Sequence, residues 1–166
     1  MAAGQTYVPI ATTTLGSAAA SYTFSSIPST YTDLVLILNA ANTSGNQAVR
    51  LTFNGDSATN YSKTGLSGNG TSAFSTRDTT SAFIGLDTYS GTSTTANAAT
   101  YVINIMNYTN TTTYKNAISR ANNAGYGVDL IVGLWRSTAA ITSLTLTSTG
   151  TFTAGSTFTL YGIAAA

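Results

Sequence analysis

The stretch from Asp33 to Ala41, with the sequence DLVLILNAA, decides the class of fold. Successive side chains of a β-strand point to opposite faces of the sheet. One face of this strand would carry Leu34, Leu36 and Leu38, and the other would carry Val35 and Ile37. Apolar residues on both faces are typical of a strand that is buried on both sides, or of one whose outer face is covered by a partner.

Shorter segments on either side alternate between apolar and polar residues, as half-buried strands do. In the segment 48–53, Val49, Leu51 and Phe53 are expected to point inward. The segment 128–135 is apolar on both faces, with Val128, Leu130, Val132 and Leu134 sharing one face and Ile131 and Trp135 on the opposite one. Further strands are predicted over 21–24, 61–66, 80–86, 99–106, 114–121, 141–147 and 157–163.

Turn residues separate these segments. Asn54-Gly55 is the strongest signal, because both central positions of a type I′ hairpin turn need a positive φ. The segment 61–66 would then be the return strand of that hairpin, and the residues SGTSTTAN at 90–97 would form an exposed loop. The chain shows no helical period over three turns.

About nine to eleven short strands at this spacing predict an all-β antiparallel β-sandwich. Periodicity alone leaves the choice between a jelly-roll-like and an immunoglobulin-like topology open. Residues 16–166 are expected to form a single sandwich domain. Residues 1–15 are expected to form either an extended N-terminal arm or an edge strand, because Pro9 interrupts an extended run.

The composition bears on the function more than any motif does. Charged residues make up 7% of the chain and the net charge is +1. Without a basic cluster, the chain lacks the phosphate footprint of a nucleic-acid-binding protein and the means to bind an anionic membrane. A weakly charged, nearly neutral surface favours association with other proteins. We therefore expect an assembly component with no nucleic-acid or membrane partner.

Catalysis is not expected. The sequence contains no His and no Cys, which are the commonest general base and the most reactive nucleophile. Five scattered Asp residues and no Glu leave little for paired-carboxylate chemistry or for a calcium site. The chain is accordingly predicted not to be an enzyme, and to have no catalytic, cofactor-binding or metal-binding residues.

Aromatic residues supply the candidate contact sites. If the first residues form an arm that docks on a neighbour, Tyr7, Val8 and Ile10 are its contact residues; if they form an edge strand, they belong to the domain itself. Trp135 and Arg136 are candidates for a subunit or capsid contact, since Trp and Arg are enriched at interface hot spots. Their alternative is a core Trp followed by a surface charge.

Loop tyrosines with Asn and Thr nearby could stack on a sugar ring while short polar side chains bind its hydroxyl groups. The alternative is that these tyrosines pack against their own sandwich or line a subunit interface. The candidates are Tyr61, Tyr89, Tyr108 and Tyr126.

Several segments resemble strands of virion proteins of tailed bacteriophages, notably phages that infect cyanobacteria. They are 31–36 (YTDLVL), 51–56 (LTFNGD), 107–111 (NYTNT), 134–137 (LWRS) and, most characteristically, 154–163 (AGSTFTLYGI). Together they cover roughly residues 20 to 163. The resemblance implies a jelly roll, often assembled as a homotrimer, in which no catalytic residue is expected.

Members of this family serve as head decoration (cement) proteins or as tail-fibre domains. The resemblance therefore implies a cement protein on the outer capsid surface of the virion, bound to the major capsid protein and to copies of itself. The short chain without a fibre shaft agrees with that role. The alternative is a tail-fibre or receptor-binding domain that recognises host cell-surface carbohydrate.

Overall fold

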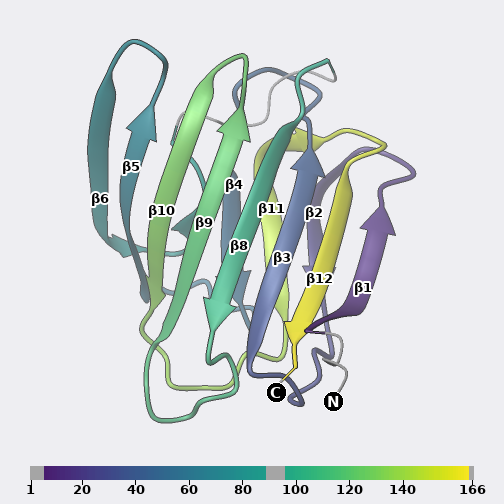
Figure 1. Ribbon diagram of the computed structural model, residues 1–166, viewed down its shortest axis with the longest axis vertical. Coiled ribbons are helices and arrows are strands. Elements are labelled where there is room, and N and C mark those ends of the chain that lie inside the picture. Colours follow the sequence, from purple (N-terminus) through teal and green to yellow (C-terminus); the bar gives the residue numbers. More distant parts are fainter. Residues whose placement is uncertain (1–5, 89–95, 165–166) are drawn as a thin grey trace.

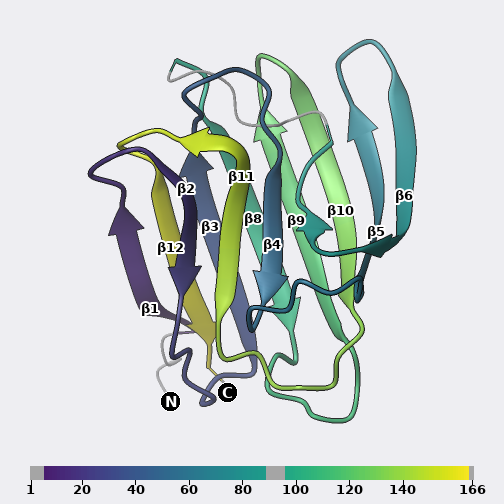
Figure 2. The same cartoon turned by 180° about the vertical axis from the view of Figure 1, so that it is seen from behind.

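The protein is a sandwich of two antiparallel β-sheets, as the sequence predicts. The computed structural model describes residues 6–88 and 96–164, and these contain twelve strands and no helix. Figure 1 shows the molecule with the larger sheet in front. Figure 2 shows it from behind, with the smaller sheet in front.

The larger sheet has eight strands in the spatial order β1-β12-β3-β8-β9-β10-β5-β6. They are β1 (Tyr7–Thr14), β3 (Asp33–Ala40), β5 (Tyr61–Gly68), β6 (Ala73–Ser81), β8 (Ala99–Met106), β9 (Lys115–Asn123), β10 (Gly127–Trp135) and β12 (Thr157–Ile163). The smaller sheet has the order β2-β11-β4-β7. Its strands are β2 (Ala19–Phe24), β4 (Val49–Phe53), β7 (Ile84–Gly85) and β11 (Leu144–Phe152).

The chain passes repeatedly from one sheet to the other. Strands β1 to β4 alternate between the two sheets, as do β7 with β8 and β11 with β12. This strand order is compatible with a jelly roll. Two hairpins, β5–β6 and β9–β10, are inserted into this path, and both extend the larger sheet beyond β8.

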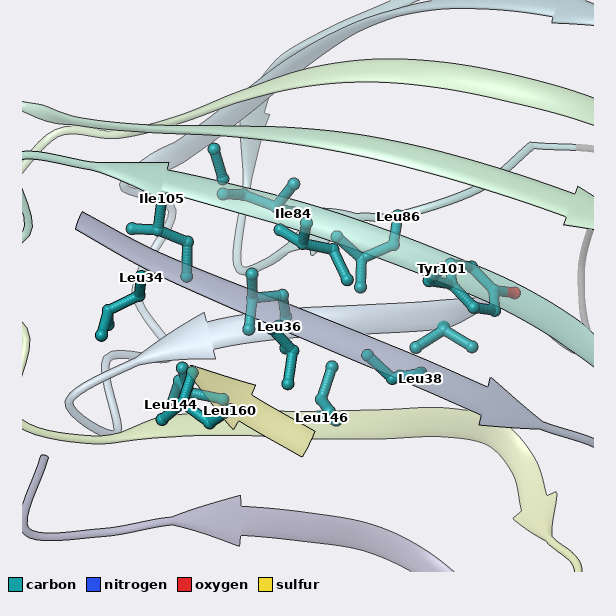
Figure 3. Packing of buried hydrophobic residues seen from close by; sticks show 14 of the residues in the cluster. Leu34, Leu36, Leu38, Ile84, Leu86, Tyr101, Ile105, Leu144, Leu146 and Leu160 are labelled. Carbon is teal, nitrogen blue, oxygen red and sulfur yellow. The ribbon is translucent and has the colours of Figure 1, made fainter. Parts of the chain in front are cut away.

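The core lies between the sheets. Leu34, Leu36 and Leu38 are fully buried, and Figure 3 shows side chains of both sheets, among them Ile84 and Leu146, gathered around them. On the outer face of β3, Val35 is also buried and Ile37 is half-buried. The predicted two-sided burial of this strand is therefore confirmed, more completely for its inner face.

The Asn54-Gly55 turn has the predicted local geometry but a different role. Asn54 has a φ of 52° and Gly55 a φ of 69°, and the Asp56 amide donates to the Phe53 carbonyl at 2.9 Å. The expected return strand does not pair with β4, however, because β5 lies in the larger sheet between β10 and β6. The turn redirects the chain from one sheet to the other.

The N-terminal segment was expected to be either an extended arm or an edge strand, and in the structure it forms an edge strand. Strand β1 pairs antiparallel with β12 over its whole length, with an irregularity in register between Pro9 and Ala11. Pro lacks an amide donor and is tolerated at an edge or a bulge. The predicted segment 80–86 divides into the end of β6 and the short β7, and most of the predicted loop at 90–97 lies outside the described residues.

Candidate interaction surface

The outer face of the inserted hairpins carries a cluster of exposed apolar side chains. Leu66 lies on β5, Ile118 on β9, and Val128, Leu130 and Val132 on β10. Each of the five is between 38% and 58% exposed. We call this cluster the β5–β9–β10 face. Single exposed apolar residues are ordinary, whereas contiguous ones make the surface a candidate for an interaction.

The register of the strands brings these side chains together. Val132 is paired with Ile118 on β9, and Leu130 is paired with Leu66 on β5. Val128 is paired with Gly68, which leaves its side chain without a flanking one on that side. Paired residues of neighbouring strands have side chains in contact distance on the same face. The five residues therefore form one continuous patch.

Strand β10 carries apolar side chains on both of its faces, and one of these two faces points outward. The prediction that Val128, Leu130, Val132 and Leu134 share a face is confirmed, and three of the four are exposed. Ile131, Trp135 and even Asp129 on the opposite face are buried. With apolar residues at odd and even positions, the sequence contains no signal for which face the core takes.

The charges around the patch all have one sign. Arg120 is paired with Leu130 and with Val102 on β8, and Arg77 is paired with Thr64 on β5. The outward positions of β5, β6, β8, β9 and β10 carry no carboxylate. The β5–β9–β10 face is thus apolar in its centre and positively charged beside it.

Trp135 is a core residue, which corrects its assignment as a contact residue. Its side chain is 2% exposed, and its ring stacks on Tyr61 with a centroid separation of 6.3 Å and lies 5.5 Å from Phe53. Its Nε1 donates to Asp56 Oδ2 at 2.7 Å. A residue held in this way is not presented at the surface of the subunit.

Arg136 holds the inserted hairpin to the end of β10. Its guanidinium donates to the carbonyl of Tyr61 at 3.2 Å and to the carbonyl of Thr79 at 2.8 Å. The guanidinium therefore bonds to backbone of both β5 and β6, so its contacts in this chain are structural.

The other three candidate contact residues lie at the opposite edge of the larger sheet. Tyr7 is 55% exposed and its ring meets Tyr161 edge-on at 6.1 Å. Val8 is half-buried, and Ile10 packs against the core. Because β1 and the inserted hairpins are at opposite ends of the strand order, the five predicted residues do not form one surface.

The loop tyrosines divide into two kinds. Tyr61 and Tyr108 are fully buried, and burial raises the pKa of Tyr61 to about 12. The hydroxyl of Tyr108 donates to the carbonyl of Pro28. Both therefore pack against their own sandwich. Tyr126, in the turn between β9 and β10, is 38% exposed, and Tyr89 lies outside the described residues.

Within the described ranges, several titratable groups are buried and have shifted pKa values. No three carboxylate, imidazole or thiol side chains come together there as a metal-binding group. Burial lowers the pKa of Lys115, whose ammonium group donates to the carbonyls of Thr113 and Thr138. The carboxyl group of Asp87 is also buried, and burial raises its pKa to about 6.

Residues 6–88 and 96–164 also contain no helix of the length and apolar character that crossing a membrane requires. A comparison with known proteins finds no matching family model, no matching curated protein and no matching solved structure. What can be proposed about function therefore rests on the surfaces of the chain.

Proposed function

We propose that this chain is a non-enzymatic structural subunit that binds the outer surface of a bacteriophage head as a decoration, or cement, protein. The observation that carries the proposal is the β5–β9–β10 face, a continuous apolar patch on the two hairpins that extend the larger sheet. A neutral chain with so few charges supports the same role, since it gains from being packed among neighbours.

The occupant of this face is another protein rather than a second copy of the chain. A copy packed face to face would bring the Arg120 guanidinium toward a surface that carries no carboxylate. Burying a charge without a partner costs free energy, whereas a partner with one acidic side chain would satisfy it. The major capsid protein is the proposed partner, and its contact surface should combine apolar residues with a carboxylate opposite Arg120.

The size of the patch suits the centre of such an interface. Side chains that are half-exposed in the free chain would each contribute about 1 kcal/mol when a partner covers them. A few central residues usually provide most of the binding energy. Leu130 lies in the middle of the patch, between Leu66 and Arg120, and is the proposed central residue.

Contacts between copies, as in the homotrimer that the resemblance implies, would use a different part of the molecule. The β1 edge is the proposed site, because an edge strand presents unpaired backbone groups. Tyr7 is exposed at that edge. Light scattering of the purified chain would give the number of copies, and a Tyr7→Ala variant would test their contact.

Binding to heads assembled without the protein tests the proposal. Leu130→Asp should abolish binding, because it places an unpaired charge at the centre of the patch. Thr23→Asp is the matched control, since Thr23 is exposed on β2 in the other sheet. Equal binding by both variants would contradict the proposal.

The alternative is a tail-fibre or receptor-binding domain for host cell-surface carbohydrate. The number of copies per virion distinguishes the two, because a cement protein covers the head in hundreds of copies and a tail component is present in far fewer.

A further inference from the structure

A polar pocket lies at the end of the sandwich where the turn between β9 and β10 meets the turn between β5 and β6 and the segment that leads into β4. Figure 1 shows these connections side by side at the upper end of the molecule. The cavity has a volume of about 410 Å³. It is lined by Asn46, Gln47, Ala48, Asn69, Asp87, Thr88, Gly125 and Tyr126.

Asp87 provides a fixed acceptor in this pocket. Its Oδ2 accepts from the Val49 amide at 2.9 Å and from the Tyr101 hydroxyl at 2.8 Å, so the carboxyl group is held in one orientation. Its Oδ1 has no hydrogen-bond partner among the described residues. A carboxyl oxygen with spare acceptor capacity, on a residue that lines a cavity, is suited to a ligand hydroxyl group.

Thr88 provides a second unused group. Its amide donates to Asp129 Oδ2 at 2.7 Å, which fixes the backbone beside Asp87. Its Oγ1 is buried and has no hydrogen-bond partner in the described part of the chain. Because buried hydroxyl groups are nearly always hydrogen-bonded in proteins, this atom is poised for a partner that the described residues do not supply.

Asn69 adds a donor whose orientation is set by the backbone. Its Oδ1 accepts from the amides of Thr71 and Ser72 at 3.0 and 2.8 Å. This arrangement identifies the oxygen of the side-chain amide and leaves its Nδ2 as a donor with no acceptor among residues 6–88 and 96–164. The pocket therefore brings together the amide donor of Asn69, the hydroxyl of Thr88 and the carboxyl acceptor of Asp87.

Tyr126 stands between this pocket and a second hollow. The second hollow has a volume of about 400 Å³ and shares Asn69, Gly125 and Tyr126 with the first. The Tyr126 amide donates to the Asn123 carbonyl at 2.9 Å, which closes the turn that presents the ring. A partly exposed aromatic ring bordered by two adjoining hollows offers a stacking surface for two consecutive units of a chain-like ligand.

We propose that this end pocket binds a neutral saccharide, with a sugar ring stacked on Tyr126 and its hydroxyl groups bound by Asn69, Thr88 and Asp87. The ligand is neutral because, among the described residues that line the pocket, Asp87 alone carries a charge, and a carboxyl group repels sulfated, phosphorylated and uronic-acid sugars. The pocket lies at the end of the sandwich and not on the β5–β9–β10 face, so saccharide binding and head binding are separate properties.

Titration of the full chain with trisaccharides, followed by amide NMR spectra, tests the proposal. The neutral probes are maltotriose, cellotriose and tri-N-acetylchitotriose, and trigalacturonate is the anionic counterpart. At least one neutral probe should shift the amide signals of residues that line the pocket, with a Kd of roughly 1 mM, and trigalacturonate should not. No shift at these residues with any neutral probe at about ten times that concentration would overturn the proposal, as would equal binding of trigalacturonate.

Three variants connect the binding to the named side chains. Tyr126→Ala should weaken binding about tenfold, and Tyr126→Phe should retain it, because the ring is kept. Thr88→Val removes a hydroxyl that has no hydrogen-bond partner among the described residues, so it should weaken binding without lowering the free energy of unfolding. Each of these variants should still bind heads, which separates this test from that of the proposed function.

Tyr114→Ala is the matched control for the loss of an exposed ring. Tyr114 is 53% exposed and precedes β9 at the opposite end of the sandwich from Tyr126. Its loss should leave saccharide binding unchanged. If Tyr114→Ala and Tyr126→Ala weaken binding equally, the saccharide does not occupy the end pocket.

Discussion

The Nε1 of Trp135 donates a 2.7 Å hydrogen bond to the Oδ2 of Asp56, and this bond joins the end of β10 to the turn that follows β4. Asp56 also accepts from Asn60 Nδ2 and from the Ala58 amide, each at 2.9 Å. The bonds from Asn60 and Trp135 are the main reason that the pKa of Asp56 is lowered. The two sheets are thus tied together where the chain crosses between them.

Removing the carboxyl group of Asp56 should destabilise the fold. Asp56→Ala leaves the buried indole N–H of Trp135 without a partner, which is expected to cost about 1–3 kcal/mol in the free energy of unfolding. Urea denaturation measures the change. Asp78→Ala is the control, because Asp78 is exposed and its 3.6 Å ion pair with Lys63 should contribute at most about 1 kcal/mol. Equal decreases in the free energy of unfolding of the two variants would show that the Trp135–Asp56 hydrogen bond stabilises the fold no more than the exposed ion pair does.

Asp87 should make the protein more stable in mild acid. Burial raises its pKa from 3.8 to about 6, so the folded state binds a proton that the unfolded state releases between these values. The stabilisation is complete below about pH 4 and is lost as the pH rises through 6, and it amounts to about 3 kcal/mol. The lowered pKa of Asp56 acts in the opposite sense, but only below its ordinary value of 3.8.

Urea denaturation between pH 4 and 7 measures this dependence. In Asp87→Asn the side-chain oxygen can still accept from Val49 and Tyr101, so the variant should fold and its stability should vary much less with pH. A wild-type free energy of unfolding that rises from pH 4 to pH 7 would contradict the assignment.

Two neighbouring residues of β10 distinguish the core face from the outer face. Ile131 is fully buried, so Ile131→Ala should lower the free energy of unfolding by about 2–5 kcal/mol. Leu130 is 43% exposed, and Leu130→Ala should change it by no more than about 0.5 kcal/mol. Thermal denaturation of both variants gives the comparison. The reverse order would mean that β10 presents its other face to the core.

Asn54 should be chemically durable although it precedes a glycine. Deamidation requires the side-chain amide carbon to approach the Gly55 nitrogen, but the Asn54 side chain is held elsewhere. Its Nδ2 donates to the Ala140 carbonyl at 2.8 Å, and its Oδ1 accepts from the amides of Thr142 and Ser143 at 2.8 and 3.1 Å. Peptide mapping after prolonged incubation should detect deamidation in urea well before it appears in the folded protein. Equal rates would show that these bonds do not protect the residue.

Local patterns in the sequence predicted most of the strands. Alternation placed Val49, Leu51 and Phe53 in the core, and all three are fully buried. The positive φ values of Asn54 and Gly55 were also predictable, because they depend on those two residues alone. The pairing partner of the next strand was not predictable, since the pairing of β5 with β10 depends on residues that are sixty or more positions away.

The candidate surfaces were harder to predict for the same reason. Trp135 resembles an interface residue in sequence, and only the three-dimensional neighbourhood of Tyr61 and Asp56 shows that it is buried. The β5–β9–β10 face arises when exposed side chains of three strands are placed in register. Tyr126 was recognised from its loop position, whereas the free hydroxyl of Thr88 has no signature in the sequence.

The two inserted hairpins form one end of the larger sheet, and this has a mechanical consequence. A subunit held through β5, β9 and β10 would receive the load from an expanding shell on these hairpins, while the strands around β3 stay outside the direct line of force. Because the edge strand β6 is paired with β5 only, its hydrogen bonds can break under tension and form again while the rest of the sandwich stays intact. The attachment would then behave as a compliant joint that absorbs strain before the fold itself is threatened.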